Sequence, residues 1–177
     1  MIAEENFSEA RRRHLLLAAG GLSNGQSLAT LQSSTGINGG VFGTRFLMTP
    51  ESQYSDTKKD VLAGACGKYA SLVTKRSMAF DEARNTLGWP AQVDGRGIVN
   101  KTVDDYETGT ISMEERQLRY LQAEKEDDPD RLIVWSGTGI ERMDAERSRL
   151  SAFQTTKLLW SEAEACLASS DKLWNQP

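Results

Sequence analysis

Residues 15–46, LLLAAGGLSNGQSLATLQSSTGINGGVFGTRF, decide the fold of this chain. Two short apolar runs in this stretch end in glycine: Leu15–Ala19 precedes Gly20-Gly21, and Val41-Phe42 precedes Gly43-Thr44. The first run is near-continuous, as in a strand that is buried on both faces. About two dozen residues separate the two turns, roughly one βα unit. Because adjacent parallel strands that end in such turns present backbone N–H groups to one phosphate, the stretch predicts a phosphate site.

The composition indicates one soluble globular domain. The chain has 177 residues, of which 38% are hydrophobic and 26% charged, enough for a core and ordinary for a soluble protein. The net charge of −4 gives no support for nucleic acid or an anionic membrane as a partner. No apolar run reaches the roughly 18 residues of a membrane span, and the first residues lack a secretory apolar region. We therefore expect a cytoplasmic location.

The sequence contains no group of residues with the spacing of metal ligands. Cys66 and Cys166 lie far apart, which favours two thiols in a reducing compartment over a metal pair. The acidic run 127–130 is followed by no histidine or further carboxylate at ligand spacing, which favours a solvated turn. The single histidine, His14, stands beside three arginines ahead of the first predicted strand. We expect it at the surface or at a strand edge, and we assign no metal ligand.

Local signals predict alternating strands and helices in the first half of the chain. A helix is expected to begin near Asn24, an acceptable N-cap, and to turn two leucines inward. A second strand is predicted over residues 38–42. Pro50-Glu51 predicts the start of a further helix, because proline suits the first helical position. Residues 71–74 are expected to form another strand.

The second half is predicted to be mostly helical. Residues 85–101, NTLGWPAQVDGRGIVNK, hold several turn-favouring pieces and predict a long loop. Ser112, followed three residues later by glutamate, fits a capping box and predicts a helix over residues 113–126. A last helix is predicted over residues 144–168. The residues expected on its buried face are Leu150, Phe153, Trp160, Ala163 and Leu167.

The glycine turns have the chemistry of a phosphate site. A phosphate dianion needs several N–H donors without a Cβ in the way, and glycine permits that approach. A helix that starts just after the turn adds its positive end. The Thr44 hydroxyl is expected to add one hydrogen bond. Arg45 either contacts the phosphate or anchors the strand end through a carboxylate or carbonyl groups. Glycine turns also end many buried strands that bind no ligand, and this alternative stays open.

Several motifs, taken in order, resemble the nitronate monooxygenases, formerly called 2-nitropropane dioxygenases, and their fungal-type members most closely. The resemblance covers residues 14–168, whereas residues 1–13 match nothing in the family. The turn motifs are shared with other FMN-dependent barrels, including enoyl reductases, while TLGWP and DGRG are more specific. The motifs are residues 18–29 (AAGGLSNGQSLA), 39–52 (GGVFGTRFLMTPES), 74–80 (TKRSMAF), 86–90 (TLGWP), 94–97 (DGRG), 100–102 (NKT) and 135–139 (WSGTG).

The resemblance implies an FMN-dependent oxidoreductase with an α/β fold. The chain would form the C-terminal part of a TIM (β/α)8 barrel, about the seventh and eighth βα units plus C-terminal helices. The implied reaction is the oxidative denitrification of an alkyl nitronate or nitroalkane with oxygen, which yields a carbonyl compound and nitrite. Residues 135–139 would approach the flavin or the substrate entrance. The residues implied to hold the FMN phosphate are Gly20, Gly21, Phe42, Gly43 and Thr44.

The chain also departs from the family. A full barrel takes roughly 250 residues, and here the seventh strand would begin near residue 15, so about six strands are missing. The family's histidine base or its equivalent lies in that missing portion, and we assign no catalytic residue. We therefore treat residues 1–177 as a single incomplete domain. As a monomer it is expected to form one sheet of two or three strands, from residues 15–19, 38–42 and 132–135, covered by four helices.

Two alternatives to catalysis follow from the missing strands. The chain could be a catalytically inactive fragment that binds FMN or another phosphate compound. It could also be an interaction module, because two barrel strands leave sheet edges open on both sides. An oligomer or a second chain that completes the barrel is the partner expected in that case.

Overall fold

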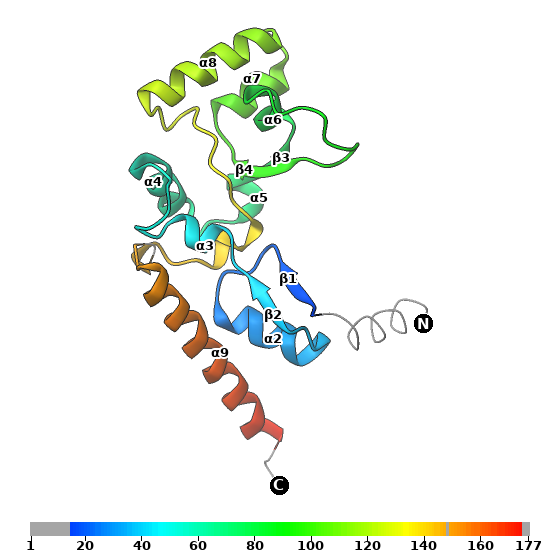
Figure 1. Ribbon diagram of the computed structural model, residues 1–177, viewed down its shortest axis with the longest axis vertical. Coiled ribbons are helices and arrows are strands. Elements are labelled where there is room, and N and C mark those ends of the chain that lie inside the picture. Colours follow the sequence, from blue (N-terminus) through cyan, green and yellow to red (C-terminus); the bar gives the residue numbers. More distant parts are fainter. Residues whose placement is uncertain (1–14, 148, 175–177) are drawn as a thin grey trace.

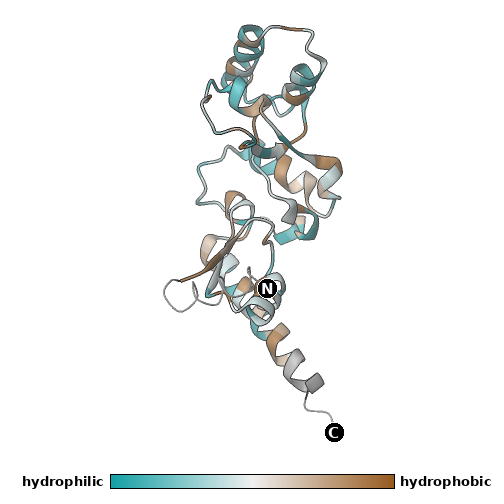
Figure 2. Cartoon of the chain, turned by 90° about the vertical axis from the view of Figure 1, so that its right-hand side faces the viewer, coloured by the Kyte–Doolittle hydropathy of each residue, from teal (hydrophilic) through white to brown (hydrophobic). Residues whose placement is uncertain are grey.

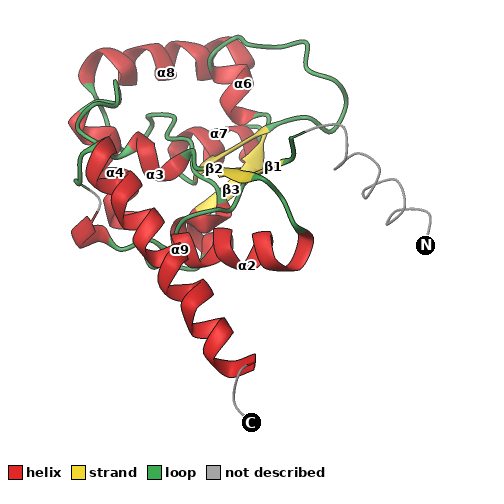
Figure 3. Cartoon of the chain, turned by 60° about the horizontal axis from the view of Figure 1, so that its bottom comes forward, coloured by secondary structure: helices red, strands yellow, loops and turns green. Residues whose placement is uncertain are grey.

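The chain folds into a lower and an upper α/β part with a cluster of short helices between them (Figure 1). The computed structural model describes residues 15–147 and 149–174. Each part has its own two-stranded sheet. The prediction of a single sheet for a monomer is therefore wrong. The last helix extends below the rest of the molecule (Figure 3).

The lower sheet is a βαβ unit. Strand β1 (Leu17–Ala19) pairs in parallel with β2 (Gly39–Val41), and helix α2 (Gly25–Thr35) connects them. The side chain of Asn24 caps this helix, since its Oδ1 accepts a hydrogen bond from the Ser27 N–H at 2.9 Å. This arrangement confirms the two strands and the helix that the sequence predicts.

The predicted burial of β1 on both faces is wrong. The side chain of Leu17 is 62% exposed, and Leu15 and Val41 are also exposed. The hydrophobic colour of β1 in Figure 2 therefore marks an uncovered surface. The physical reason is that β2 is the only strand paired with β1 in the described part of the chain, and α2 covers only one face of the pair.

The last helix, α9 (Ala152–Trp174), packs along α2. The two backbones approach closely at Gly25, where an added Cβ would lie 2.0 Å from the Leu159 carbonyl oxygen. The helix begins at residue 152 instead of 144, because residues 145–147 form the short 3₁₀ helix η2 (Ala145–Arg147). Glycine at position 25 thus sets the line along which α9 contacts the rest of the molecule.

The buried face of α9 differs from the predicted one. Thr155, Leu159 and Ala163 are buried at a spacing of four residues along the line of contact with α2. Of the residues expected to be buried, only Ala163 is, while Trp160 is 68% exposed and Phe153 is also exposed. The sequence pattern counts every apolar residue as core, whereas the contact with α2 selects a narrow stripe.

The central cluster joins short helices around one hydrophobic core. It contains α3 (Thr44–Leu47), α4 (Asp56–Ala65), α5 (Ala70–Val73) and the 3₁₀ helix η1 (Thr138–Arg142). Its largest fully buried side chains are Met48, Leu62, Leu132, Val134 and Ile140.

Two predicted boundaries in the central cluster are wrong. The helix expected from Pro50 begins at Asp56, because the Ser55 side chain caps it and residues 50–52 form a turn. The strand expected over residues 71–74 is mostly helix α5, and the strand starts at Thr74. In both cases local backbone hydrogen bonds close a turn that the sequence signals do not predict: Ser52 N–H donates to the Thr49 carbonyl, and Val73 N–H donates to the Tyr69 carbonyl.

The upper sheet pairs β3 (Thr74–Ser77) with β4 (Gly95–Ile98) in antiparallel fashion. Strand β4 lies within residues 85–101, so only the first part of the predicted loop is irregular. Trp135 forms an isolated antiparallel bridge to Gly97, which places residues 132–135 beside β4 and away from the lower sheet. An added Cβ at Gly95 would lie 2.3 Å from the Trp135 ring, so glycine is needed for this packing.

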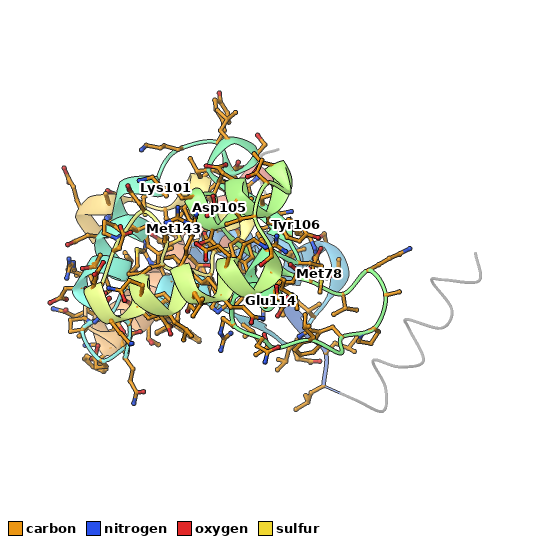
Figure 4. The ribbon with its side chains drawn as sticks, turned by 90° about the horizontal axis from the view of Figure 1, so that it is seen from above. Met78, Lys101, Asp105, Tyr106, Glu114 and Met143 are labelled. Atoms are coloured by element: carbon orange, nitrogen blue, oxygen red, sulfur yellow. The ribbon has the colours of Figure 1, made fainter. Side chains whose placement is uncertain are left out.

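Three helices complete the upper part: α6 (Ala79–Ala83), α7 (Lys101–Thr108) and α8 (Met113–Glu126). Helix α6 contacts β4, and α7 and α8 pack on α6. The N-cap of α8 is confirmed, because the Ser112 hydroxyl accepts a hydrogen bond from the Glu115 N–H at 3.2 Å. The Glu115 carboxylate, which would complete a capping box, accepts a hydrogen bond from Arg119. Figure 4 looks down on α7 and α8, where the labelled Asp105 accepts hydrogen bonds from Arg119 and Arg131. None of the helices in the described part of the chain combines the length and hydropathy of a membrane span.

Candidate functional site

Three glycine turns meet at the junction of the lower sheet and the central cluster. The first is Gly20-Gly21 after β1, the second is Gly43-Thr44 after β2, and the third is residues 136–139. The Gly137 N–H donates a hydrogen bond to Thr44 Oγ1 at 2.9 Å. An added Cβ at Gly137 would lie 3.7 Å from the Gly21 nitrogen. The structure therefore brings together turns that are far apart in the sequence.

The third turn packs directly on the first. An added Cβ at Gly139 would lie 2.6 Å from the Gly21 carbonyl oxygen, a distance that only glycine tolerates. Gly21 has a φ of +73°, and an added Cβ there would lie 3.2 Å from Thr138 Oγ1. The two turns therefore need glycine at both positions.

The first and second turns leave open space in front of their glycines. Added Cβ atoms at Gly20 and at Gly43 would have no heavy atom within 4 Å. Gly43 has φ −81° and ψ −74°, values that other residues also adopt, so its backbone does not require glycine. The open space, and not the conformation, is the notable property of Gly43.

Thr44 and Phe42 have roles that the sequence does not show. The Thr44 oxygen accepts the Gly137 N–H, so this hydroxyl holds the third turn in place and keeps its hydrogen to donate elsewhere. The Phe42 side chain lines an apolar groove between α2, β2 and α9. It therefore points away from the glycine turns, and only its backbone lies beside them.

A cavity of about 540 Å³ opens beside the first turn. It lies at the N-terminal end of α2, and its lining includes Gly20, Gly21, Thr138 and Arg142. The Arg142 side chain is exposed and forms no hydrogen bond or ion pair with the rest of the described chain. Sequence reasoning missed this arginine, although it follows Gly139 by one turn of 3₁₀ helix.

Arg45 lies elsewhere. Its side chain is only 5% exposed, and its Nε has no hydrogen-bond partner. Burial lowers the pKa of this guanidinium, and the carboxylate of Glu162 partly offsets the effect. Arg45 does not line the cavity beside the first turn. Within the described chain its side chain forms no hydrogen bond or ion pair with a carboxylate or a carbonyl, the two kinds of anchor that the sequence suggests.

The cysteines and the acidic run 127–130 take part in local packing and capping contacts. Cys66 and Cys166 are not joined in a disulfide, and burial raises the pKa of the Cys66 thiol. Asp127 ends α8 with φ 53° and accepts a hydrogen bond from the Ser55 hydroxyl at 2.8 Å. Among the described residues no group of three or more potential ligands could hold a metal ion. His14 and residues 1–13 lie outside the described residues.

Two curated relatives are similar to this chain in sequence. A nitronate monooxygenase from Neurospora crassa is 28% identical over 137 residues, which are 77% of this chain and 35% of the relative. The nitronate monooxygenase npaC from Metarhizium robertsii is 32% identical over 94 residues, 53% of this chain and 26% of the relative. The chain is related to the nitronate monooxygenases. It spans about a third or less of the length of these relatives, and no protein-family model matches it.

Solved structures show the same fold class. A nitroalkane oxidase from Streptomyces ansochromogenes matches 94% of this chain and 44% of its own, with a TM-score of 0.64 and 19% identity. FabK from Thermotoga maritima matches 94% of this chain and 50% of its own, with a TM-score of 0.68 and 16% identity. At these identities the likeness shows the fold alone: an α/β chain that covers part of a TIM barrel.

Proposed function

We propose that the glycine turns of this nitronate monooxygenase relative bind the phosphate of FMN. In this proposal β1 and β2 correspond to the seventh and eighth strands of the barrel. The observation that carries the proposal is the contact of the third glycine turn with both other turns, together with the open space in front of Gly20 and of Gly43. Glycine turns at the ends of adjacent parallel strands are a common phosphate site in such barrels.

The backbone supplies hydrogen-bond donors for this phosphate. The N–H groups of Gly20, Gly21 and Gly43 donate to no other group in the described chain. Backbone N–H groups need a partner, and a phosphate oxygen accepts them strongly because it is charged. The N-terminal end of helix α2 lines the cavity beside Gly20 and Gly21 and adds a positive partial charge that favours a phosphate there.

A positive side chain completes the site. The Arg142 guanidinium has no anionic partner among the described residues and lines the cavity beside Gly20 and Gly21. A guanidinium offers two parallel N–H groups, which suit two oxygens of a phosphate. Arg142 thus takes the role that the sequence analysis left open for Arg45.

The names of the two relatives support a proposal for the substrate and the reaction class. We propose an alkyl nitronate or nitroalkane as the substrate and oxygen as the oxidant. The flavin, when bound, would accept electrons from the nitronate. The described residues around the cavity include no histidine or carboxylate, so none of them is assigned as the base.

The lack of a base among the described residues around the cavity favours two alternatives. The same lining would also suit a chain that binds FMN without turnover, or that binds it as one part of a larger barrel. The exposed apolar face of β1 and β2 supports the second case, since further strands or a second chain would cover it.

The test is a fluorescence titration of the purified chain with FMN, and with riboflavin as the phosphate-free control. Saturable FMN binding with much weaker riboflavin binding is expected, because the proposed contacts are to the phosphate. A nitronate assay on the FMN-bound chain then separates an enzyme from a binding protein. A folded chain that binds FMN no better than riboflavin would refute the proposed site.

A further inference from the structure

A second cavity lies in the upper part of the molecule, away from the glycine turns. It measures about 450 Å³ and lies between α6, the start of β4 and the loop that joins them, which projects to the right in Figure 1. Its lining includes Asp81, Arg84, Trp89 and Trp135 and shares no residue with the cavity beside Gly20. The volume falls in the range of small-molecule sites.

Two indole rings form the apolar walls of this cavity. Trp135 is held in place by the Phe80 ring: the two ring centres lie 5.4 Å apart, and the ring planes meet at 72°. The backbone N–H of Trp135 donates a hydrogen bond to the Tyr54 hydroxyl at 3.1 Å. Trp89 is 58% exposed and lines the same cavity. One fixed indole and one accessible indole provide flat apolar surface, which favours a flat ring as ligand.

The carboxylate of Asp81 lines this cavity and forms no ion pair with a described residue. Asp81 is only 6% exposed, and its Oδ1 accepts a hydrogen bond from the Thr86 hydroxyl at 3.1 Å. No described residue donates to its Oδ2 or forms an ion pair with it. Its Oδ2 is not among the buried atoms that lack a partner, so this oxygen is open to the cavity and can accept an N–H from a ligand.

A guanidinium offers the opposite chemistry in the same cavity. The Arg84 side chain lies over the Trp135 ring, 5.9 Å from its centre, and donates no hydrogen bond to the described chain. Arg84 and Asp81 form no ion pair with each other, so each keeps its hydrogen-bonding capacity. Because an anion would meet Asp81 and a cation would meet Arg84, the pair favours a neutral ligand with both a donor and an acceptor.

We propose that this cavity binds a neutral, flat heteroaromatic ring with a lactam edge, an N–H beside a C=O. Asp81 accepts the ring N–H, Arg84 donates to the ring carbonyl, and the two indoles contact the ring faces. The site is independent of the proposed FMN phosphate site, since it needs no phosphate and none of the glycine turns.

The probe for this site is quinazolinone, a flat bicyclic lactam without a phosphate. The titration follows the indole N–H signals of the full chain by NMR. Saturable binding that shifts the Trp89 and Trp135 signals is expected. The N-methyl derivative keeps the ring and lacks the N–H, so its dissociation constant should be about tenfold higher or more.

Variants of the protein complete the test. Asp81→Asn keeps one oxygen that accepts the Thr86 hydroxyl and puts an amide NH2 group in place of the vacant acceptor oxygen. The dissociation constant of quinazolinone should therefore rise about tenfold or more. Trp160→Ala, an exposed indole outside this cavity, is the control and should leave binding unchanged. Equal affinity of the unaltered chain for quinazolinone and its N-methyl derivative would overturn the proposal. Tighter binding of the anion benzoate or the cation benzamidine than of quinazolinone would overturn it as well. Both titrations are made without flavin, whose ring also has a lactam edge, so neither result depends on whether the glycine turns bind the FMN phosphate.

Discussion

Replacing Gly43 with valine tests the phosphate site without disturbing the fold. The backbone at Gly43 is right-handed, and its Cβ would meet no heavy atom within 4 Å. Valine therefore fits the folded chain, and we expect a change of about 0.5 kcal/mol or less in the free energy of unfolding. The added methyl groups instead fill the space in which the proposed phosphate lies.

The expected loss of FMN affinity can be estimated from the contacts that valine removes. A hydrogen bond to a charged group contributes about 1.5–3 kcal/mol, so displacing the phosphate from one N–H weakens binding by about 10- to 150-fold. Riboflavin has no phosphate, and its affinity should not change. The assay is the flavin fluorescence titration, with circular dichroism to check folding.

Gly64→Val is the matched control for this substitution. Gly64 lies in α4, and its Cβ would also meet no heavy atom within 4 Å. It belongs to none of the three glycine turns and lies against other residues of the central cluster, so FMN affinity should be unchanged. The reasoning fails if the Gly43→Val chain is folded and binds FMN as tightly as the unaltered chain.

Four further substitutions test the site and the fold. Arg142→Gln should weaken FMN binding about tenfold at low salt and leave riboflavin binding unchanged, as measured by the same titration. Arg45→Met should keep FMN binding and leave stability equal or up to about 2 kcal/mol higher in thermal unfolding, because it removes a buried guanidinium whose Nε is unpaired. Gly139→Ala should lower stability by about 1–3 kcal/mol and weaken FMN binding, since its Cβ would lie 2.6 Å from the Gly21 oxygen. Ser112→Ala should cost about 1 kcal/mol in urea unfolding with no effect on FMN, because only the cap of α8 is lost.

Local signals were enough to predict the elements that carry the candidate site. The βαβ unit of residues 17–41 follows from apolar runs, an N-cap and glycine turns that lie close together in sequence. The capping box predicted α8 with its observed bounds, Met113–Glu126. These signals act within one turn or one strand, and they need no knowledge of distant contacts.

Long-range packing decided the features that the sequence could not predict. The buried stripe of α9 depends on Gly25, more than a hundred residues earlier in the chain, which lets the two helices approach. Residues 132–135 look like a strand for the lower sheet, but the aromatic packing of Trp135 on Gly95 and Phe80 places them beside β4. In each case glycine and a partner far along the chain are needed together.

In the proposed site, the position of the two arginines illustrates that adjacency in sequence is a poor guide to a phosphate ligand. Arg45 follows Thr44, yet successive residues of a helix point about 100° apart, so Thr44 contacts the third turn while Arg45 turns into the protein. Arg142 is remote from the first turn in sequence, and the contact of Gly139 with Gly21 brings it to the cavity. In the proposed site, the 3₁₀ helix η1 that follows the third turn therefore supplies, through Arg142, the positive charge for the phosphate. If Arg45→Met lost FMN and Arg142→Gln kept it, the ligand would lie deeper than the cavity, and this assignment would be reversed.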